Sequence, residues 1–306
     1  MRGLIVAVLG VAVVAAAALW FLSAPTHSKF APPGEPDVAR GEEVFWAGGC
    51  SSCHAAPGAK GDDKLVLAGG LAIKSDFGTF YAPNISSNDV AGIGGWTLQQ
   101  FVDAMTQGTS PEGTHLYPSF PYTSYTRMTI SDLNDLFGYM LTLPSSDHVA
   151  PAHELGFPFD IRRAVGLWNL LYLVEKPVIS IDANSTQLLR GQYLVEGPGH
   201  CGECHTPRTR IGGLKRNQWL AGAENPDGEG IIPNITPEGS IKDWSASDIA
   251  YYLESGFTPD YDSVGGSMVS VQQNMAKLPA SDREAIAAYL KAVPGRANGF
   301  PAKTGQ

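Results

Sequence analysis

The longest apolar stretch of the chain lies at its N-terminus. No charged residue occurs between Gly3 and Leu22, and Arg2 is the charge that precedes this stretch. As one helix these residues would measure about 30 Å, close to the hydrocarbon thickness of a bilayer. A cleaved signal has a shorter apolar core and a small-x-small cleavage site, which Leu22-Ser23-Ala24 matches poorly. The pattern favours an uncleaved membrane helix over residues 1–23, with a cleaved signal as the alternative, and in both cases Arg2 stays inside while the remainder is exported.

The next segment is polar and rich in proline. Residues 24–36 predict a semi-rigid linker that lifts the following domain off the membrane. Asp37 then provides an N-terminal cap for a helix that ends at the Gly48-Gly49 pair. The apolar positions that fall on one face of this helix are Val38, Val44 and Phe45.

The sequence beyond the linker repeats itself at an interval of about 150 positions. The recurring pairs are Arg40-Gly41 with Arg190-Gly191, Pro83-Asn84-Ile85 with Pro233-Asn234-Ile235, and Leu143-Pro144 with Val293-Pro294. In each copy a tryptophan, Trp96 or Trp244, precedes a stretch with helical apolar spacing, and a Ser-Asp pair opens the last amphipathic helix. These last helices are predicted over 131–143 and 281–293. The fold class is therefore all-α, with homologous domains over residues 37–145 and 181–300.

Composition narrows the class of protein. The 306 residues allow two domains of ordinary size, and a 43% share of hydrophobic residues is sufficient for packed cores. The 35 glycines and 22 prolines indicate many turns between short helices. The formal net charge of -9 argues against a nucleic-acid partner, which needs a basic face. It is compatible with attraction to a basic patch on a partner protein, and equally with an acidic surface that has no such role.

All four cysteines of the chain belong to two motifs of the form Cys-x-x-Cys-His. The motifs are Cys50-Ser51-Ser52-Cys53-His54 and Cys201-Gly202-Glu203-Cys204-His205. This is the attachment pattern for haem c. Two thiols at this spacing reach the two vinyl groups on one edge of a porphyrin, and the adjacent histidine lies under the ring as an iron ligand. We therefore predict two covalent haems, attached at Cys50, Cys53, Cys201 and Cys204 and ligated by His54 and His205.

Other uses of these cysteines fit the spacing less well. The paired knuckles of a four-cysteine zinc site usually lie about 15–20 residues apart, whereas a much longer stretch separates Cys53 from Cys201. A thioredoxin-like dithiol needs no histidine after its second cysteine, and a disulfide framework is typical of short secreted domains. Haem attachment also belongs on the exported side of the membrane, in agreement with the N-terminal segment.

A connecting segment of residues 146–180 lies between the two copies. Its apolar residues between Gly156 and Leu173 predict a helix packed at the domain interface. Arg162 and Arg163 begin this helix, and an exposed position on the helix surface is favoured for them over pairing with haem propionates.

Cytochromes c use methionine as a second axial ligand of the iron, and the chain has six methionines as candidates. Met105 and Met140 occupy helical positions among apolar residues and are expected in the core. In the second domain, Met268 follows Gly265-Gly266-Ser267 on a predicted loop, where glycine lets the backbone approach the haem edge. Met268 is therefore preferred to Met275 as the ligand.

In the first domain, Phe120-Pro121 stands where small cytochromes c often carry Met-Pro. Met128 lies on the same loop, at the position that corresponds to Leu278 in the repeat, so that it can also be a core residue. We prefer Met128 as the ligand because an empty iron face would leave a reactive site. His115 is the second candidate, since imidazole also binds iron well. The remaining histidines are expected in solvated loops: His27, His148, His153 and His200.

The paired domains resemble the cytochrome c subunit of membrane-bound alcohol and gluconate dehydrogenases and its two-haem relatives. The stretches that carry the resemblance are Tyr81-Ala82-Pro83-Asn84-Ile85-Ser86, Gly92-Ile93-Gly94-Gly95-Trp96-Thr97, Leu116-Tyr117-Pro118-Ser119-Phe120-Pro121-Tyr122 and Gly265-Gly266-Ser267-Met268. The likeness covers about residues 37–296. It implies tandem cytochrome c-like haem domains behind an N-terminal membrane helix. By resemblance, such proteins accept electrons from a periplasmic dehydrogenase and pass them to quinone or a terminal oxidase.

The sequence thus favours an electron-transfer protein over an enzyme. It predicts a dihaem relay in the inner membrane, with a single N-terminal helix and the haem domains in the periplasm. The alternative is a dihaem enzyme, such as a peroxidase or a thiosulfate-oxidising cytochrome, with an unusually ligated first haem. Phe120 in place of the expected Met is the feature that favours this alternative. A third hypothesis, in which the chain is only a membrane tether and docking subunit, predicts no loss of electron flow when Met268 is replaced by Ala.

Overall fold

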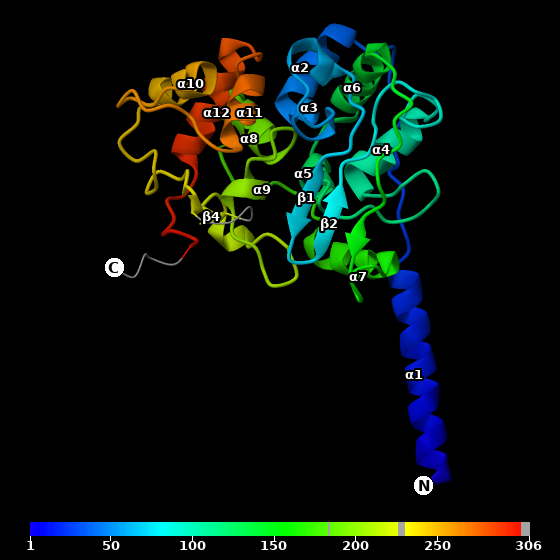
Figure 1. The fold of residues 1–306 in the computed structure, drawn as a ribbon. Helices are drawn as coiled ribbons and strands as arrows, with labels where there is room; N and C mark the ends of the chain where they lie inside the picture. The colour runs from blue at the N-terminus through cyan, green and yellow to red at the C-terminus, as the bar shows by residue number, and fades with distance from the viewer. Residues whose placement is uncertain (183, 226–229, 301–306) are drawn as a thin grey trace.

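A computed structural model describes residues 1–182, 184–225 and 230–300 of the chain. Figure 1 shows two helical domains side by side, with one long helix projecting from the base of the first domain. Short helices joined by loops make up most of both domains. The mostly helical architecture confirms the predicted fold class.

The projecting helix is α1 (Arg2–Leu22). Its stretch Gly3–Leu22 has a mean hydropathy of 2.7, and none of it is buried in the protein. By length and composition it is able to cross a membrane. The structure therefore confirms that the N-terminal segment forms one continuous apolar helix.

The first domain is built on two crossing helices, α2 and α6. Its helical elements are α2 (Val38–Gly48), α3 (Cys50–His54), η1 (Gly61–Leu65), α4 (Leu98–Gln107), α5 (Tyr122–Tyr125) and α6 (Ile130–Thr142). As predicted, the Asp37 carboxylate caps α2 by accepting hydrogen bonds from backbone N–H groups of its first turn. Val44 and Phe45 are buried, whereas Val38 is exposed, so the apolar face begins later along α2 than the sequence indicated.

The second domain repeats this plan with the crossing helices α8 and α12. Its elements are α8 (Thr186–Glu196), α9 (Gly202–His205), η2 (Arg216–Gln218), β4 (Ala223–Glu224), β5 (Ile231–Ile232), α10 (Ala246–Ser255), α11 (Met268–Met275) and α12 (Ala280–Ala292). The helices that follow the two tryptophans, α4 and α10, both begin with a capping box, at Thr97 and Ser245. The repeat in the sequence is therefore a repeat of structure.

The repeated Arg-Gly pair shows how the long helices cross. A Cβ at Gly41 would lie 2.0 Å from the backbone oxygen of Asp135, and one at Gly191 would lie 1.9 Å from that of Ala285. Only glycine permits two helix backbones to approach so closely. The arginine before each glycine pairs with a carboxylate of the facing helix: Arg40 with Asp135, and Arg190 with Asp282.

A small antiparallel sheet departs from the all-helical expectation. Its strands are, in spatial order, β1 (Ala72–Ser75), β2 (Gly78–Tyr81) and β3 (Glu154–Leu155). Ile73 of β1 lies opposite Phe80 of β2, and Phe80 packs with Tyr117 and Val165 in a cluster of its own. Because β3 belongs to the connecting segment, the sheet ties the start of that segment to the first domain.

Residues 24–36 do not lift the first domain away from the end of α1, so the interpretation as a spacer was wrong. They lie along the domain: Nδ1 of His27 is 2.8 Å from a carboxylate oxygen of Asp103, and the backbone N–H of Ser28 donates to the other oxygen at 2.7 Å. Phe30 packs against the core of the domain. We call this segment the strap. The composition of the strap is typical of a free linker, so the sequence did not predict its contacts with the first domain.

The helix predicted in the connecting segment is α7 (Arg162–Tyr172), and it touches both domains. The Tyr122 hydroxyl of the first domain donates to the Asn169 side chain at 2.7 Å. The Trp168 indole donates to the carbonyl of Ile211 in the second domain at 2.8 Å. These contacts place α7 at the domain interface, in agreement with the prediction.

Arg162 is exposed, as predicted, whereas Arg163 is half-buried against the end of α1, which corrects its expected place on an exposed surface. Nε of Arg163 donates to the Ser23 hydroxyl at 3.0 Å, and its guanidinium lies 4.4 Å from the centre of the Trp20 ring. Arg162 donates to the carbonyl of His115 at 3.0 Å. Residues that are 140 positions apart meet here, so no local pattern could have revealed the contact.

Candidate haem-binding sites

The first Cys-x-x-Cys-His motif forms its own short helix, α3. Gly49, between α2 and α3, has a φ of 60°, a left-handed conformation that favours glycine. Cys50 and Cys53 are neighbours one turn apart on α3, so both thiols serve the same side of the helix. Nδ1 of His54 lies 2.9 Å from the carbonyl oxygen of Pro83. A carbonyl only accepts, so Nδ1 carries the proton and Nε2 is left as the free ring nitrogen.

The second motif repeats this geometry. Cys201 and α9 make up one helical turn, and Nδ1 of His205 lies 2.8 Å from the carbonyl oxygen of Pro233. A Cβ at Gly202 would lie 2.1 Å from the Trp219 ring. The residue after the first cysteine is therefore glycine because the aromatic ring fills the space beside it.

The repeated Pro-Asn-Ile stretch holds the two carbonyls in place. Asn84 and Asn234 are 6% and 1% exposed. The Asn84 amide donates to the carbonyls of Ser146 and His148, at 2.8 and 2.9 Å. The Asn234 amide donates to the carbonyl of Arg296 at 2.8 Å. Each asparagine thus ties the loop that orients the histidine to the chain after the last helix of its domain.

The surroundings of the first cysteine in each motif favour a neutral thiol over a thiolate. Burial raises the pKa of Cys50 and that of Cys201 to about 12. A redox dithiol or a zinc ligand needs a thiolate, and hence a lowered pKa. Within the described ranges of the chain, no group of three or more His, Cys, Asp or Glu side chains is placed to hold a metal ion. Both observations weigh against the zinc and dithiol alternatives.

The side chains of both motifs fit a haem c. Burial lowers the pKa of His54 and that of His205, which favours neutral imidazoles. A neutral ring whose Nδ1–H is bound to a carbonyl presents the Nε2 lone pair to a metal. The second cysteine of each motif, Cys53 or Cys204, is exposed. Each motif therefore offers two thiols for thioether bonds and one oriented imidazole.

The methionines occupy different surroundings. Met268 is the first residue of α11 rather than part of a loop, and it packs, partly buried, against the core of the second domain. Met275 lies deeper in that core, at 4% exposed. Met128 is 6% exposed in the core of the first domain. Met105 and Met140 are buried, as predicted.

The backbone shows which loop residues correspond in the two domains. The N–H groups of Leu116 and Val264 donate equivalent hydrogen bonds of 2.7 Å to the glycines that end α4 and α10. Phe120 follows Leu116 at the same interval as Met268 follows Val264, so Phe120 and Met268 are equivalent positions of the two domains. Phe120 packs against the first-domain core. The first domain therefore lacks a methionine at the position of Met268, and its methionine in this segment, Met128, lies further along, just before the last helix.

His115, the other ligand candidate for the first haem, is engaged elsewhere. Its Nε2 lies 2.8 Å from the carbonyl of Ser23, and the residue is 4% exposed. This contact holds the ring at the end of α1. Besides His27, two other histidines that were expected in solvent are engaged: Nδ1 of His153 accepts a backbone N–H at 3.1 Å, and Nε2 of His200 lies 3.2 Å from the carbonyl of Gly48.

The third position of each motif reaches into the other domain. Glu203 accepts hydrogen bonds from the hydroxyls of Ser124 and Thr123, at 2.8 and 3.1 Å. Ser52, its counterpart in the first motif, accepts a hydrogen bond from the Asn274 amide at 2.8 Å. Ser124 and Asn274 are separated by about 150 positions, the interval of the repeat. The contact is therefore reciprocal, as in an interface with two-fold symmetry.

The residues in front of the two motifs also meet. The carbonyl of Gly48 accepts hydrogen bonds from Nε2 of His200 and, at 3.4 Å, from the Tyr125 hydroxyl. A Cβ at Gly48 would lie 3.5 Å from Sγ of Cys50 and 3.9 Å from the carbonyl oxygen of Pro198. The two haem-attachment helices, α3 and α9, thus lie on either side of the contact at the Gly48 carbonyl. Sequence reasoning missed this contact because the residues that form it follow no periodic pattern.

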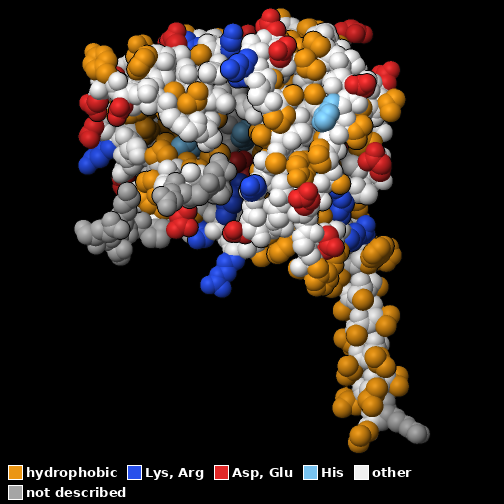
Figure 2. Space-filling model, viewed as in Figure 1, with side chains coloured by type: hydrophobic (Ala, Val, Ile, Leu, Met, Phe, Trp, Pro, Cys, Tyr) orange, Lys and Arg blue, Asp and Glu red, His pale blue; other side chains and the backbone are white. Residues whose placement is uncertain are grey.

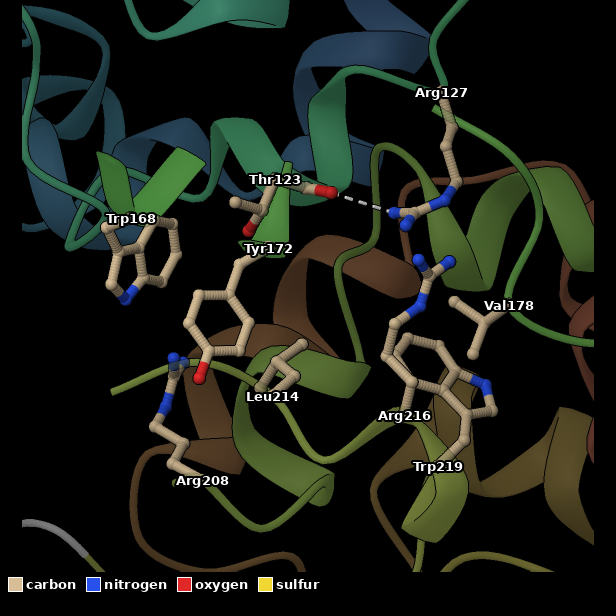
Figure 3. A pocket seen from close by; sticks show the side chains of 9 residues that line it. All are labelled: Thr123, Arg127, Trp168, Tyr172, Val178, Arg208, Leu214, Arg216 and Trp219. Atoms are coloured by element: carbon tan, nitrogen blue, oxygen red, sulfur yellow. Dashed lines mark hydrogen bonds between the residues drawn. The ribbon is translucent and has the colours of Figure 1, made fainter. Parts of the chain in front are cut away.

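A small pocket beside α9 is lined by both domains and by the connecting segment (Figure 3). Arg127 and Arg216 point toward each other in it, and both donate to the carbonyl of Lys176 at 3.1 Å. Arg208 pairs with Glu203 at 2.7 Å. Burial opposes the charge of Glu203, but Arg208 and the hydroxyl donors outweigh it and hold the pKa of this carboxyl below its ordinary value. Arg127 and Arg216 therefore hold the connecting segment in place through its backbone carbonyl at Lys176.

Comparison with known proteins decides the family. The family model for cytochrome c matches residues 38–144. A diheme cytochrome c-type protein of Cereibacter sphaeroides is 52% identical over 298 residues, which are 96% of this chain and 99% of that protein. The chain belongs to the dihaem cytochrome c family. Haem c is therefore the cofactor of this cytochrome, with one attachment motif in each domain.

Further relatives are subunits of dehydrogenases. The fructose dehydrogenase cytochrome subunit of Gluconobacter japonicus is 36% identical over 277 residues, which are 89% of this cytochrome and 56% of that subunit. The alcohol dehydrogenase (quinone) cytochrome c subunit of Gluconobacter oxydans is 32% identical over 270 residues, 84% of this cytochrome and 55% of that subunit. The chain thus spans about half the length of these two subunits. The relatives support a role in electron transfer.

Proposed function

We propose that this dihaem cytochrome is held in the inner membrane by α1, with both haem domains in the periplasm. We propose further that it relays electrons from a periplasmic dehydrogenase to an oxidase or a quinone-reactive complex of the respiratory chain. Relatives that are cytochrome subunits of fructose and alcohol dehydrogenases support this partner class. Arg2, ahead of an apolar stretch without charge, favours an N-terminus that stays inside.

The reciprocal contact of the two motifs is the observation that carries the relay. Haem c, when bound, supplies a reversible one-electron couple at each motif. Glu203 and Ser52 each bind the equivalent short helix of the other domain, at 2.8 Å in both cases. The two attachment helices, α3 and α9, therefore share one partly buried interface instead of standing at opposite ends of the molecule. Such a placement suits the passage of an electron within the chain.

The proposed axial ligands are His54 with Met128 and His205 with Met268. Replacing a true methionine ligand by leucine should remove its share of the far-red absorption band of ferric haem with methionine ligation. We expect this loss for Met268→Leu and for Met128→Leu. The matched control for the second domain is Met275→Leu, which alters a core methionine at 4% exposed and should leave the band unchanged. Retention of the full band in Met128→Leu would mean that the first haem has another sixth ligand.

Deletion of the gene tests the proposed relay. Membranes of the deletion strain should lose oxygen uptake with the substrate of one periplasmic dehydrogenase, while uptake with NADH stays intact. The unaltered gene should restore the lost activity, and Cys201→Ala, which prevents complete attachment at the second motif, should not. Undiminished uptake with a wide panel of sugars, alcohols and sugar acids would contradict the proposal.

A charge placed at the motif contact tests the internal route. Ser124→Asp would set a carboxylate against Glu203, whereas Asn274→Asp places the same group against the neutral Ser52. Like charges at a buried contact repel, so Ser124→Asp should separate the attachment helices and slow electron exchange between the haems. Asn274→Asp should slow it less. Equal exchange rates in both variants, measured by flash photolysis with a photoreductant, would contradict the route through this contact.

A dihaem peroxidase or thiosulfate-oxidising enzyme is the second candidate. Phe120 favours it, because a phenyl ring in the first domain corresponds to Met268 in the second and cannot ligate iron. A high-spin component in the ferric spectrum together with rapid reduction of peroxide by the purified protein would support this candidate over the relay.

A further inference from the structure

An apolar surface lies at the base of the first domain, where α1 leaves it. Figure 2 shows hydrophobic side chains gathered at this end of the molecule, above the exposed helix. The surface is formed by α7 and the turn before it, and its exposed side chains are Phe157 at 82%, Phe159 at 43%, Ile161 at 46%, Leu170 at 59% and Leu171 at 65%. We call these residues the α7 patch. A cluster of this kind marks a contact surface, since single exposed apolar residues are common but contiguous groups are not.

The junction between α1 and the domain is closed. Ser23, directly after the last residue of α1, is 3% exposed. Its carbonyl accepts a hydrogen bond from His115, and its hydroxyl accepts one from Arg163 at the start of α7. A Cβ at Gly166 of α7 would lie 2.3 Å from the Ser23 oxygen. The end of α1 therefore packs directly on α7 without an intervening spacer.

The strap prevents the domain from swinging away. The Thr26 hydroxyl donates to the Gln107 side chain at 2.9 Å, and the carbonyl of Thr26 accepts the Thr109 hydroxyl at 2.9 Å. His27 and Ser28 continue the fastening at Asp103. Consequently the position of α1 in a bilayer also sets the position of the first domain.

We propose that the α7 patch lies in the headgroup region of the same bilayer that α1 crosses. This inference rests on the anchoring of α1 proposed above. The apolar stretch of α1 runs to Leu22 without a charge, so immersion of that stretch brings the base of the domain to the level of the headgroups. Figure 1 shows α7 across this base, beside the upper end of α1. Amphipathic helices that expose a row of apolar side chains bind membranes in this position.

A lipid surface fits the patch better than a partner protein does. The helix that carries the patch is joined to the membrane helix through the contact of Arg163 with Trp20, and an arginine beside an aromatic ring is typical of the membrane–water boundary. Between residues 157 and 172 the charged side chains are Asp160, Arg162 and Arg163, a net positive charge that suits anionic headgroups. A protein partner would have to exclude lipid from a surface immediately beside a membrane span.

Depth-dependent quenching tests the proposal on the full-length holoprotein. The four native cysteines are consumed by haem attachment, so a single introduced cysteine carries a fluorophore. The labelled variants are Leu171→Cys in the patch, Val11→Cys within α1, and Val90→Cys as an exposed control on the first domain outside the patch. They are reconstituted, without any partner protein, in vesicles of phosphatidylcholine and phosphatidylglycerol that contain nitroxide-labelled lipid.

We expect the lipid quencher to act at least about threefold more strongly on Leu171→Cys than on Val90→Cys, and most strongly on Val11→Cys. A label at Leu171 that is as accessible to a water-soluble quencher as the label at Val90, while Val11 stays quenched by lipid, would overturn the contact of the patch but leave the anchoring of α1 intact. A Val11 label that lipid does not quench would overturn both.

A charge-reversal variant provides the second arm. Leu170→Asp combined with Leu171→Asp places two carboxylates on the patch, where they oppose anionic headgroups and the apolar region. The lipid quenching of a label at Phe159→Cys should then fall about threefold, with unchanged haem spectra and unchanged quenching at Val11→Cys. Unaltered quenching at Phe159→Cys in this variant would refute contact of α7 with lipid.

Discussion

The crossing of α8 and α12 at Gly191 provides the sharpest test of the packing. In Gly191→Ala the added Cβ would lie 1.9 Å from the carbonyl oxygen of Ala285, 2.6 Å from its carbon and 2.8 Å from Cβ of Tyr289. Real Cβ atoms essentially never come within 3.0 Å of such atoms. Two of the three collisions are with backbone, so a side-chain rotation does not relieve them, and the helices must separate by about 1 Å.

The separation disturbs a buried network as well. Tyr289 is fully buried, and its hydroxyl donates to the carboxylate of Glu196 on α8. Glu196 in turn accepts the backbone N–H groups of Val178 and Ile179 of the connecting segment. Overpacking usually costs about 1–3 kcal/mol, and a collision with backbone beside such a network should reach the upper end, about 3 kcal/mol. For a domain of this size that loss lowers the melting temperature by roughly 10 °C.

Thermal unfolding of the holoprotein, followed by circular dichroism and by the haem absorption, measures this loss. The control is Gly156→Ala in the connecting segment, away from both haem motifs, where an added Cβ meets nothing within 4 Å and should change the melting temperature by no more than about 2 °C. Gly41→Ala should reproduce the loss in the first domain, since its Cβ would lie 2.0 Å from the Asp135 oxygen. A Gly191→Ala protein that melts with the control would refute the explanation of the repeated Arg-Gly pair.

Three further results are expected. Asn234→Ala removes the buried amide that donates to the carbonyl of Arg296 and should lower the free energy of unfolding by about 2 kcal/mol in urea titrations; no change would show that water replaces the amide. Burial and the charge of Arg162 lower the pKa of His153, whose Nδ1 accepts a backbone N–H. The neutral imidazole therefore contributes to stability above its ordinary pKa. This contribution is lost as the pH falls through the lowered pKa, at no more than about 1.4 kcal/mol per pH unit. His153→Asn, with an oxygen acceptor, should flatten that acid limb, and an identical limb would exclude His153 as its source. Glu203→Gln weakens its bonds to Ser124 and Arg208 and should cost about 1–2 kcal/mol, visible as faster proteolysis of the connecting segment; unchanged cleavage would show that the motif contact does not hold the domains together.

Much of the chemistry could be read from the sequence because it is local. Cys50, Cys53 and His54 lie within one helical turn, so their spacing alone predicts how they meet one porphyrin edge. The helix in front of the motif was likewise predicted from one cap and the glycine pair that ends it. The Pro-Asn-Ile repeat marked the loop that orients each histidine, although its role became visible only with the bond from His54 to the carbonyl of Pro83.

The errors arose where contacts join distant parts of the chain. The strap has the composition of a free linker, but the carboxylate of Asp103 and the core around Phe30 fix it to the first domain. His115 has the ligand chemistry for iron, yet the carbonyl of Ser23 occupies its Nε2. Arg163 begins a helix like many exposed arginines, and only the end of α1 gives it a partner. Each contact depends on two segments that are far apart in sequence, and periodicity carries no information about such pairs.

By itself, the sequence determined the cofactor, the number of its sites, the repeated helical domains and the apolar N-terminal helix. These properties follow from short spacings and from hydrophobic period, which the backbone geometry of a helix translates directly into structure. The tertiary structure decided how the domains join through Glu203 and Ser52, and how α1 is clamped against α7 at the base of the first domain. Those arrangements depend on which folded surfaces complement one another, and that complementarity exists only once both domains are packed.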